Sequence, residues 1–225
     1  MIINNKDFIV SCQALEHEPL HSSYIMSKLA LAASMGGAKG IRANTVDDIK
    51  AIKNEVDLPL IGIIKKDFTD SDIYITPTMN EIDDLVEAGA DVIALDATNR
   101  LRPGKIELVD FYASIKNKYP NILLMADCST FEEMHSASSL GFDYIGTTLF
   151  GYTPYSKKSA FEDYDIFKEK TKSIKSKIIA EGQISTPSQA SEILKLDNIY
   201  AIVVGGAITR PMDITSRFIK ACYEE

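Results

Sequence analysis

The 225-residue chain has few cysteines and no long hydrophobic run. Its three cysteines, Cys12, Cys128 and Cys222, are widely spaced, which argues against a disulfide-rich scaffold and is typical of reduced thiols. No segment contains the roughly 18 consecutive apolar residues of a membrane-spanning helix. The first residues lack the basic stretch and apolar segment of a signal peptide. We therefore predict a cytoplasmic protein without a membrane partner.

Basic residues are also scarce. Lys and Arg total 24 against 32 Asp and Glu, so the formal net charge is -8 and the isoelectric point is about 5.0. An acidic chain without a basic tract is a poor partner for nucleic acid or for an anionic membrane surface, and we predict neither interaction. A local basic site for a phosphorylated small molecule is compatible with this composition.

Histidine is the third scarce residue, and its one suggestive motif does not predict a metal site. The segment "HEPLH", residues 17–21, matches the zinc-protease pattern H-E-x-x-H. That pattern requires a helix, and Pro19 lies inside it, where a proline costs roughly 3 kcal/mol. The remaining histidine, His135, supplies no obvious third ligand. We predict no metal site.

Short apolar runs alternate with longer amphipathic segments along the whole chain. Roughly eight such strand–helix units in a chain of this length are what a closed (β/α)₈ TIM barrel requires, whereas a doubly wound sheet usually needs fewer strands. No linker or charge block interrupts the alternation, so we predict an α/β protein with a single TIM-barrel domain over residues 1–225. The expected strands cover residues 8–12, 38–43, 58–65, 91–97, 122–128, 142–149, 177–182 and 200–206.

Helix start and stop signals support this alternation. Thr45 precedes one helical segment, with Asp48 placed as the acid of a capping box. Thr130 precedes another segment, which ends at Gly141, the residue type preferred just past a helix. Pro187 stands where the first turn of a third helix tolerates proline.

Polar and ionisable residues stand at the ends of the expected strands. In TIM barrels the catalytic groups lie at these C-terminal ends, and partly buried charges require partners or a ligand. Each residue taken singly also fits an ordinary strand terminus, because any strand leaving a core meets polar residues. The residues at these positions are Gln13, Arg42, Lys65, Asp96, Asp127, Thr147, Thr148, Glu181, Gly205 and Gly206.

Lys65 closes the apolar run "LPLIGIIK". Burial in such a context disfavours the ammonium form and lowers the pKa of a lysine toward that of a usable base. By strand alternation the next residue, Lys66, faces the other way. The pattern does not decide which of the two points inward, and the alternative is that both begin a solvated loop.

Glycines follow the last two expected strands, in "EGQISTP" and "VVGGAITRP". The loops after the seventh and eighth strands of these barrels often hold a phosphate against backbone N–H groups. Gly182, Gly205 and Gly206 would let the backbone approach an anion, and Arg210 adds a cation suited to phosphate. We predict a barrel of the phosphate-binding type, with glycine turns used only for packing as the alternative.

Several segments together resemble the bacterial N-acetylmannosamine-6-phosphate 2-epimerase family. They include "GGAKGIRAN", "LPLIGIIKKDF", "VIALDAT", "MADCST", "GFDYIGTTLFGYT" and "VVGGAITRP", and the similarity runs from about Ile9 to Phe218. The resemblance implies a (β/α)₈ barrel that interconverts N-acetylmannosamine 6-phosphate and N-acetylglucosamine 6-phosphate. It also implies no cofactor, and a homodimer through the last helix.

The resemblance assigns roles to residues of this chain. Lys65 matches the family's catalytic lysine, and Glu181 matches its carboxylate in the "EG" motif. The residues expected to bind substrate are Gln13, Arg42, Asp127 and Arg210, and those expected at the phosphate are Gly182, Gly205 and Gly206.

The implied chemistry requires proton transfers at two places on the sugar. Carbon 2 is not acidic in the closed ring, and opening to the aldehyde places a carbonyl beside it. Lys65 is the candidate base at carbon 2, Glu181 the candidate at the ring oxygen, and Arg42 the positive charge near the enolate. The proton transfers could also be permuted among Lys65, Glu181 and Asp127.

Two other classes of function use the same residues. A Schiff-base aldolase would use Lys65 as a nucleophile toward a phosphorylated keto acid. A phosphosugar-binding protein would hold the ligand without exchanging its carbon-2 proton. A metal-dependent pentulose-phosphate epimerase is disfavoured because the expected strand ends carry no histidine.

Overall fold

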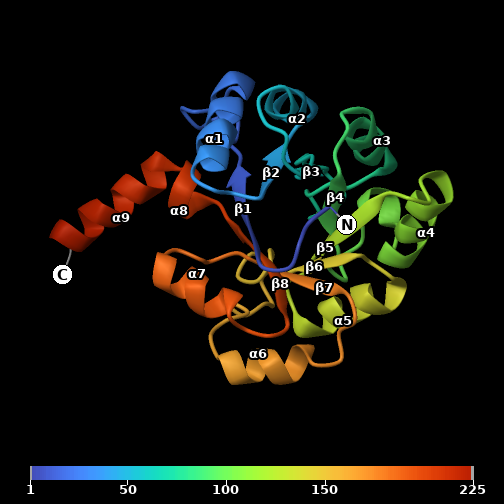
Figure 1. Ribbon diagram of the computed structural model, residues 1–225. Helices are drawn as coiled ribbons and strands as arrows, with labels where there is room; N and C mark the ends of the chain where they lie inside the picture. The colour runs from blue at the N-terminus through green and yellow to red at the C-terminus, as the bar shows by residue number, and fades with distance from the viewer. Residues whose placement is uncertain (1, 224–225) are drawn as a thin grey trace.

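The computed structural model of the protein describes residues 2–223 and has a closed barrel of parallel strands at its centre (Figure 1). The strands follow chain order, and β8 pairs with β1, which confirms the TIM barrel and excludes the doubly wound sheet. Residues 1, 224 and 225 of the predicted domain lie outside the described residues. The strands are β1 (Asp7–Cys12), β2 (Gly40–Asn44), β3 (Leu60–Ile63), β4 (Val92–Asp96), β5 (Leu123–Asp127), β6 (Tyr144–Gly146), β7 (Lys177–Glu181) and β8 (Ile199–Val204).

Helices surround the barrel, except that the last one points away from it (Figure 1). Each expected apolar run overlaps one observed strand, with ends that differ by a few residues, and a helix follows each strand. Of the helices in the described residues, none has the length and apolar content needed to cross a bilayer. The helices are α1 (Ser23–Met35), α2 (Val46–Lys53), α3 (Met79–Glu87), the 3₁₀ turn η1 (Pro103–Lys105), α4 (Leu108–Lys118), α5 (Phe131–Leu140), α6 (Tyr164–Thr171), α7 (Pro187–Leu194), α8 (Gly206–Thr209) and α9 (Pro211–Tyr223).

The expected helix caps are present, with one difference. Thr130 and Glu133 form a reciprocal capping box on α5, which ends at Gly141 with a left-handed φ of 102°. Thr45 accepts a hydrogen bond from the backbone N–H of Asp48, as a cap of α2 should. The Asp48 carboxylate does not return to complete the predicted box, because it accepts a hydrogen bond of 2.7 Å from Ser23 of α1.

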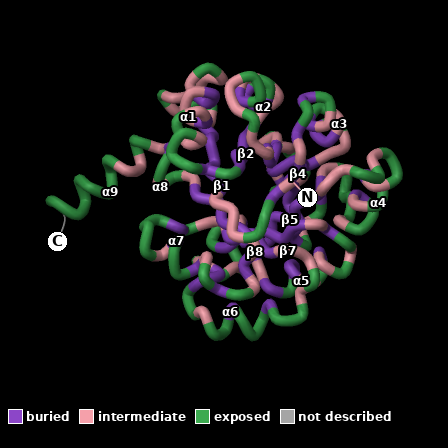
Figure 2. The backbone as a smooth tube through the Cα atoms, viewed as in Figure 1, coloured by how far each residue is buried: buried purple, intermediate pink, exposed green. Residues whose placement is uncertain are grey.

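The strands separate two apolar layers, which explains why they appear as continuous apolar runs in the sequence. In β4, Val92 and Ala94 belong to the cluster inside the barrel, whereas Ile93 and Leu95 belong to the cluster beneath the helices. Figure 2 shows the buried stretches concentrated in the strands, with α9 largely exposed. Because side chains alternate along a strand, the inward series fixes which polar residues enter the barrel at its far end.

The same alternation brings charged residues into the barrel interior. Met125 faces inward on β5, and so does Asp127 two residues later. On β7, Ile179 faces inward, so Glu181 two residues later does so too. On β2, Ile41 and Ala43 face outward, so Arg42 between them faces inward. These three side chains meet at the C-terminal ends of the strands.

The "HEPLH" segment is not helical. Residues 17–21 form turns between β1 and α1, so the two histidines do not share a helix face. This arrangement agrees with the rejection of the zinc-protease motif. Cys12 and Cys128 are buried in the outer apolar layer, as small packing residues would be.

Candidate active site

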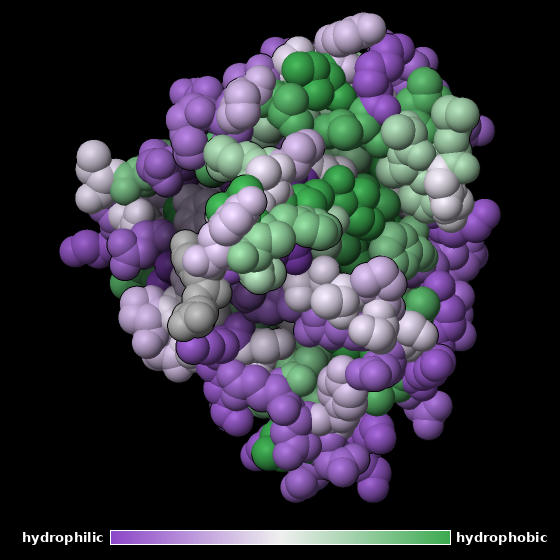
Figure 3. All heavy atoms as spheres, turned by 90° about the vertical axis from the view of Figure 1, so that its left-hand side faces the viewer, coloured by the Kyte–Doolittle hydropathy of each residue, from purple (hydrophilic) through white to green (hydrophobic). Residues whose placement is uncertain are grey.

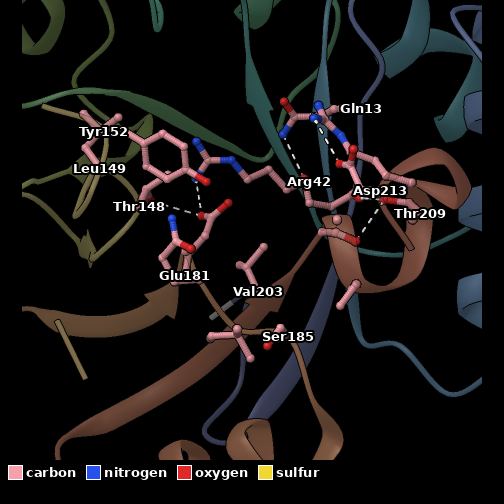
Figure 4. A pocket seen from close by; sticks show the side chains of 18 of the residues that line it. Gln13, Arg42, Thr148, Leu149, Tyr152, Glu181, Ser185, Val203, Thr209 and Asp213 are labelled. Atoms are coloured by element: carbon pink, nitrogen blue, oxygen red, sulfur yellow. Dashed lines mark hydrogen bonds and ion pairs between the residues drawn. The ribbon is translucent and has the colours of Figure 1, made fainter. Parts of the chain in front are cut away.

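A cavity of about 440 Å³ opens at the C-terminal ends of the strands. Figure 4 shows its side chains converging from several strands and from the loops that follow them. Of the residues to which the family resemblance assigns a role, all but Asp127 line this cavity. They are Gln13, Arg42, Lys65, Glu181, Gly182, Gly205, Gly206 and Arg210.

Arg42 is the most heavily bonded side chain of the site. Its Nη1 and Nη2 atoms donate to the two carboxylate oxygens of Asp127 at 3.0 and 2.6 Å, and Nη1 also donates to Oε2 of Glu181 at 2.6 Å. Arg42 is only 1% exposed. Burial opposes its charge, but the two carboxylates outweigh burial and raise the pKa of Arg42.

Lys65 lies two residues beyond the end of β3, where its backbone N–H donates to the side chain of Asn44 at 2.9 Å. Burial lowers the pKa of Lys65 to about 8, and the charges of Arg42 and Arg210 act in the same direction. A substantial fraction of this amine is therefore neutral near physiological pH.

Lys66 points away from the cavity. Its ammonium pairs with Glu81 of α3 at 3.1 Å and is half-exposed. The structure thus settles which lysine of the pair faces inward, because Lys65 lines the cavity and Lys66 does not.

Glu181 ends β7 with its backbone held on both sides by Thr147. The Thr147 hydroxyl donates to the carbonyl of Glu181 at 2.7 Å and accepts from its N–H at 3.0 Å. Burial raises the pKa of Glu181 to about 7, although the charge of Arg42 opposes this shift. A carboxyl group with this pKa can give and take a proton near neutral pH.

Asp127 and Asp96 differ from the sequence expectation. Asp127 is fully buried behind the cavity wall, where it contacts Arg42 and Thr148. Asp96 is also fully buried, and it pairs with Arg100 at 2.6 Å outside the cavity lining. The prediction that Asp96 joins the mouth of the barrel was wrong, because a local partner four residues away takes its charge.

The glycines of the last two loops allow close packing. Gly182 has a φ of 93°, and an added Cβ would lie 3.2 Å from the carbonyl of Thr148. An added Cβ on Gly205 would lie 3.2 Å from Cβ of Ser11. Within residues 2–223, no acceptor contacts the backbone N–H groups of Gly206 and Ala207, which leaves both donors for an anion in the cavity.

Two arginines stand at this glycine-rich end of the cavity. Arg210 pairs with Glu18 at 3.4 Å, and Glu18 is fixed in turn by the backbone N–H of Leu15 at 2.6 Å. Arg217 of α9 also lines the cavity and donates to the carbonyl of Ser185 at 3.3 Å. The sequence analysis missed Glu18 and Arg217, since no spacing signal links either residue to a strand end.

Gln13 completes the wall beside β1. Its side-chain amide donates to the hydroxyl of Ser11 at 2.8 Å, so the amide is oriented before any ligand binds. Tyr152, from the loop after β6, lies at the opposite part of the cavity rim (Figure 4). The cavity therefore has a buried acid–base side and an arginine-rich side.

Comparison with known proteins identifies the family. A profile of the family described as "Putative N-acetylmannosamine-6-phosphate epimerase" matches residues 26–224. The chain belongs to this family. The resemblance predicted from the sequence is confirmed.

Relatives of this epimerase family cover nearly the whole chain. Proteins of Listeria innocua and Borreliella afzelii, both described as "Putative N-acetylmannosamine-6-phosphate 2-epimerase", are 54% and 55% identical to it. The alignments cover 93% and 96% of this chain, and 91% and 94% of the respective relatives.

Solved structures give the same result. The N-acetylmannosamine-6-phosphate 2-epimerase of Clostridium perfringens superimposes with a TM-score of 0.91 and 50% identity, covering 97% of this chain and 94% of the other. A thiamine phosphate pyrophosphorylase of Pyrococcus furiosus shares the fold alone, with a TM-score of 0.61 and 18% identity over 94% of this chain and 90% of the other.

Replacing Arg42 should destabilise the protein in a pH-dependent way. Arg42→Met leaves two carboxylates at a buried position without their cation, which costs about 3–5 kcal/mol of the free energy of unfolding near pH 8. The loss should shrink near pH 5, because a buried carboxylate without a partner takes up a proton and becomes neutral. Urea denaturation at the two pH values measures both effects.

The matched control is Lys118→Met, which removes a cation from an exposed pair with Asp83. This variant should leave the free energy of unfolding nearly unchanged. An Arg42→Met protein as stable as the wild type near pH 8 would show that Arg42 does not balance the buried charges.

Proposed function

We propose that this member of the family is an N-acylglucosamine-6-phosphate 2-epimerase. It interconverts N-acetylmannosamine 6-phosphate and N-acetylglucosamine 6-phosphate without a cofactor, in the breakdown of sialic acid and amino sugars. One observation carries the proposal: Lys65 and Glu181 line one cavity with pKa values of about 8 and 7, next to the buried Arg42. The printed names of the relatives support the substrate.

The two groups suit the two proton transfers. Glu181, when protonated, donates to the ring oxygen while the anomeric hydroxyl gives its proton to water, and the sugar ring opens to the aldehyde. Lys65, when neutral, removes the proton at carbon 2, which the neighbouring carbonyl has made acidic. Arg42 supplies positive charge beside the negative oxygen that develops in the enolate. Water returns a proton to the opposite face of carbon 2, which inverts the centre, and the Lys65 ammonium gives its proton to the hydroxide that remains.

The charges of the site permit this pair of protonation states, and pKa values of about 8 for Lys65 and about 7 for Glu181 make it the less populated of two arrangements that share one proton. Arg42 carries one positive charge, and Asp127 accepts both of its parallel hydrogen bonds. The charges of Arg42 and Asp127 cancel. A neutral Lys65 beside a protonated Glu181 then has a net charge of zero, and so has a Lys65 ammonium beside a Glu181 carboxylate. The two arrangements hold the same number of protons, so moving one proton between Lys65 and Glu181 converts one into the other.

The opposite side of the cavity suits the phosphate of the substrate. Arg210 and Arg217 supply two cations, and the N–H groups of Gly206 and Ala207 supply two backbone donors. Gly182 and Gly205 let this part of the chain pack closely on Thr148 and Ser11, which positions the two loops around the cavity. Binding the phosphate here directs the rest of the sugar toward Lys65 and Glu181.

The proposed assembly is a homodimer through α9. Helix α9 has no buried residue between Pro211 and Tyr223, and Phe218 is 70% exposed. Figure 3 faces the side from which α9 projects and shows hydrophobic surface gathered near its centre. A second copy that covers this surface would remove it from water. The cytoplasmic location also stays a proposal, supported by the three free thiols Cys12, Cys128 and Cys222.

If α9 forms the dimer interface, a charged residue in α9 should halve the molar mass of the particle in solution. Light scattering after gel filtration should give a dimer for the wild type and a monomer for Phe218→Lys, because a charge opposes burial of α9. The matched control on the same helix, Lys220→Gln, should remain a dimer. A monomeric wild type would contradict the homodimer and leave the proposed reaction untouched.

Replacing Lys65 tests the base at carbon 2. In D₂O the wild-type enzyme should place deuterium at carbon 2 of its product, as NMR would show. Lys65→Met keeps an unbranched side chain and removes the amine, so epimerisation and deuterium incorporation should both fall by about 10²- to 10⁴-fold. Phosphosugar binding should persist, because Arg210 and Arg217 remain in the cavity wall to bind the phosphate.

Lys66→Met is the matched control and should lose much less activity, since the Lys66 ammonium pairs with Glu81 outside the cavity. A folded Lys65→Met protein that exchanges the proton at the wild-type rate would assign the base to another residue. Covalent trapping of the substrate by borohydride in the wild type would instead favour the Schiff-base aldolase.

Replacing Arg210 tests the phosphate side. Arg210→Ala should weaken binding of N-acetylmannosamine 6-phosphate, because a charge-assisted contact to the phosphate is lost. Binding of unphosphorylated N-acetylmannosamine should change little, since that sugar carries no anion. Isothermal titration with both sugars measures the difference, and equal losses for both would mean that Arg210 has a structural role.

A further inference from the structure

The hydroxyl of Thr148 lies between the two carboxylates of the site. Its Oγ1 atom is 2.7 Å from Oδ1 of Asp127 and 3.1 Å from Oε2 of Glu181. Figure 4 shows Thr148 and Glu181 turned toward each other. A hydroxyl has one hydrogen, so it can donate to only one of these two oxygens at a time.

The shorter contact indicates which oxygen receives the hydrogen. Donation to Asp127 leaves a lone pair of Oγ1 facing Glu181, and a lone pair facing an ionised carboxylate is repulsive. A proton on Oε2 of Glu181 turns this contact into a hydrogen bond that Oγ1 accepts. Nη1 of Arg42 cannot accept this proton in place of Oγ1, because a guanidinium only donates hydrogen bonds, here to Asp127 and Glu181.

Glycine at position 146 lets the Thr148 hydroxyl lie close to Asp127. An added Cβ on Gly146 would lie 2.5 Å from Cε of Met125, 2.7 Å from Oγ1 of Thr148 and 3.2 Å from Oδ1 of Asp127, so a larger residue would displace these groups. Glycine at position 146 therefore leaves room for the hydroxyl to contact Asp127.

We propose that Thr148 is a positioning residue that keeps a proton on Glu181, by accepting from the protonated carboxyl while donating to Asp127. This inference rests on the proposed function, in which Glu181 must be protonated to donate to the ring oxygen. The hydrogen-bond chain runs from Glu181 through Thr148 to Asp127, and Arg42 closes it from the other side. The sequence placed Thr148 at a strand end and assigned it no role.

Other charges also act on Glu181. Burial raises the pKa of Glu181, Arg42 lowers it, Asp127 raises it and Lys65 lowers it. Donation of the Thr148 hydroxyl to Glu181 would also lower this pKa, but the shorter contact, to Asp127, directs the hydrogen away from Glu181. The remaining titratable or charged residues that line the cavity are Tyr74, Tyr152, Arg210, Asp213 and Arg217. A substitution at Thr148 alters one of these groups, Asp127, which loses a hydrogen bond of 2.7 Å in Thr148→Val. Thr148→Ser keeps the contacts with both carboxylates, so the comparison of Thr148→Val with Thr148→Ser reports on the hydroxyl.

The first experiment measures the proton on Glu181 without any substrate. The infrared band of a protonated carboxyl is followed against pH in the wild type and is assigned by its loss in Glu181→Gln. In Thr148→Val, which keeps the shape and removes the hydroxyl, the midpoint should move to lower pH by about one unit. In Thr148→Ser, which retains the hydroxyl, the midpoint should stay close to that of the wild type.

The second experiment measures the pH dependence of kcat/KM for epimerisation. Thr148→Val should lower the maximum about tenfold and move its acid limb in the same direction as the infrared midpoint, because less Glu181 is protonated when Lys65 is neutral. KM should change little, since Arg210 contacts Glu18 and Arg217 contacts Ser185, whereas the Thr148 hydroxyl contacts the two carboxylates. Thr148→Ser should recover most of the activity.

Two results would overturn the inference: an unchanged midpoint in Thr148→Val, or a Thr148→Ser midpoint displaced as far as that of Thr148→Val. If Thr148→Val does not fold, Thr148→Ala provides the same comparison. A wild-type protein that does not epimerise the sugar would contradict the proposed function alone, because the infrared titration needs no reaction.

Discussion

The contact of Arg42 with two buried carboxylates is the interaction on which the rest of the site depends. Its guanidinium binds both oxygens of Asp127 and one oxygen of Glu181, with almost no exposure to water. Three charges at this depth are tolerated because each is paired, and removal of Arg42 leaves both carboxylates uncompensated. The same guanidinium helps to lower the pKa of Lys65, so one side chain links the acid and the base of the proposed reaction.

The barrel makes this contact possible by bringing three distant strands together. Arg42, Asp127 and Glu181 come from β2, β5 and β7, and each continues an inward-facing series along its strand. In a closed barrel the inward side chains at the C-terminal ends converge on one axis. The apolar interior excludes water from these groups, and this burial shifts the pKa values of Lys65 and Glu181 toward neutrality. The fold therefore supplies both the position and the acidity of the proposed catalytic groups.

Much of the fold was predictable from local patterns, and much of the site was not. The apolar runs predicted the strands, and Thr130, Gly141 and Pro187 marked helix ends correctly because capping depends on a few adjacent residues. Hydrogen bonds and ion pairs between residues far apart in the sequence were not predictable. Asp48 bonds to Ser23 instead of completing its capping box, Arg210 pairs with Glu18 from another loop, and Arg217 reaches the cavity from the last helix. The prediction for Asp96 was wrong for a different reason. Its partner Arg100 is only four residues away, but no sequence pattern distinguishes an acid in a structural ion pair from a catalytic acid.

In the proposed reaction Lys65 and Glu181 transfer protons to and from the sugar near neutral pH, because burial and the charge of Arg42 set their pKa values. The most direct measurement is the pH dependence of kcat/KM of the wild-type enzyme with N-acetylmannosamine 6-phosphate. These pKa values predict a bell-shaped profile that falls below about pH 7, where Lys65 and Glu181 are both protonated, and above about pH 8, where both have lost the proton. A rate that keeps rising to about pH 10, where an ordinary lysine loses its proton, would contradict the account.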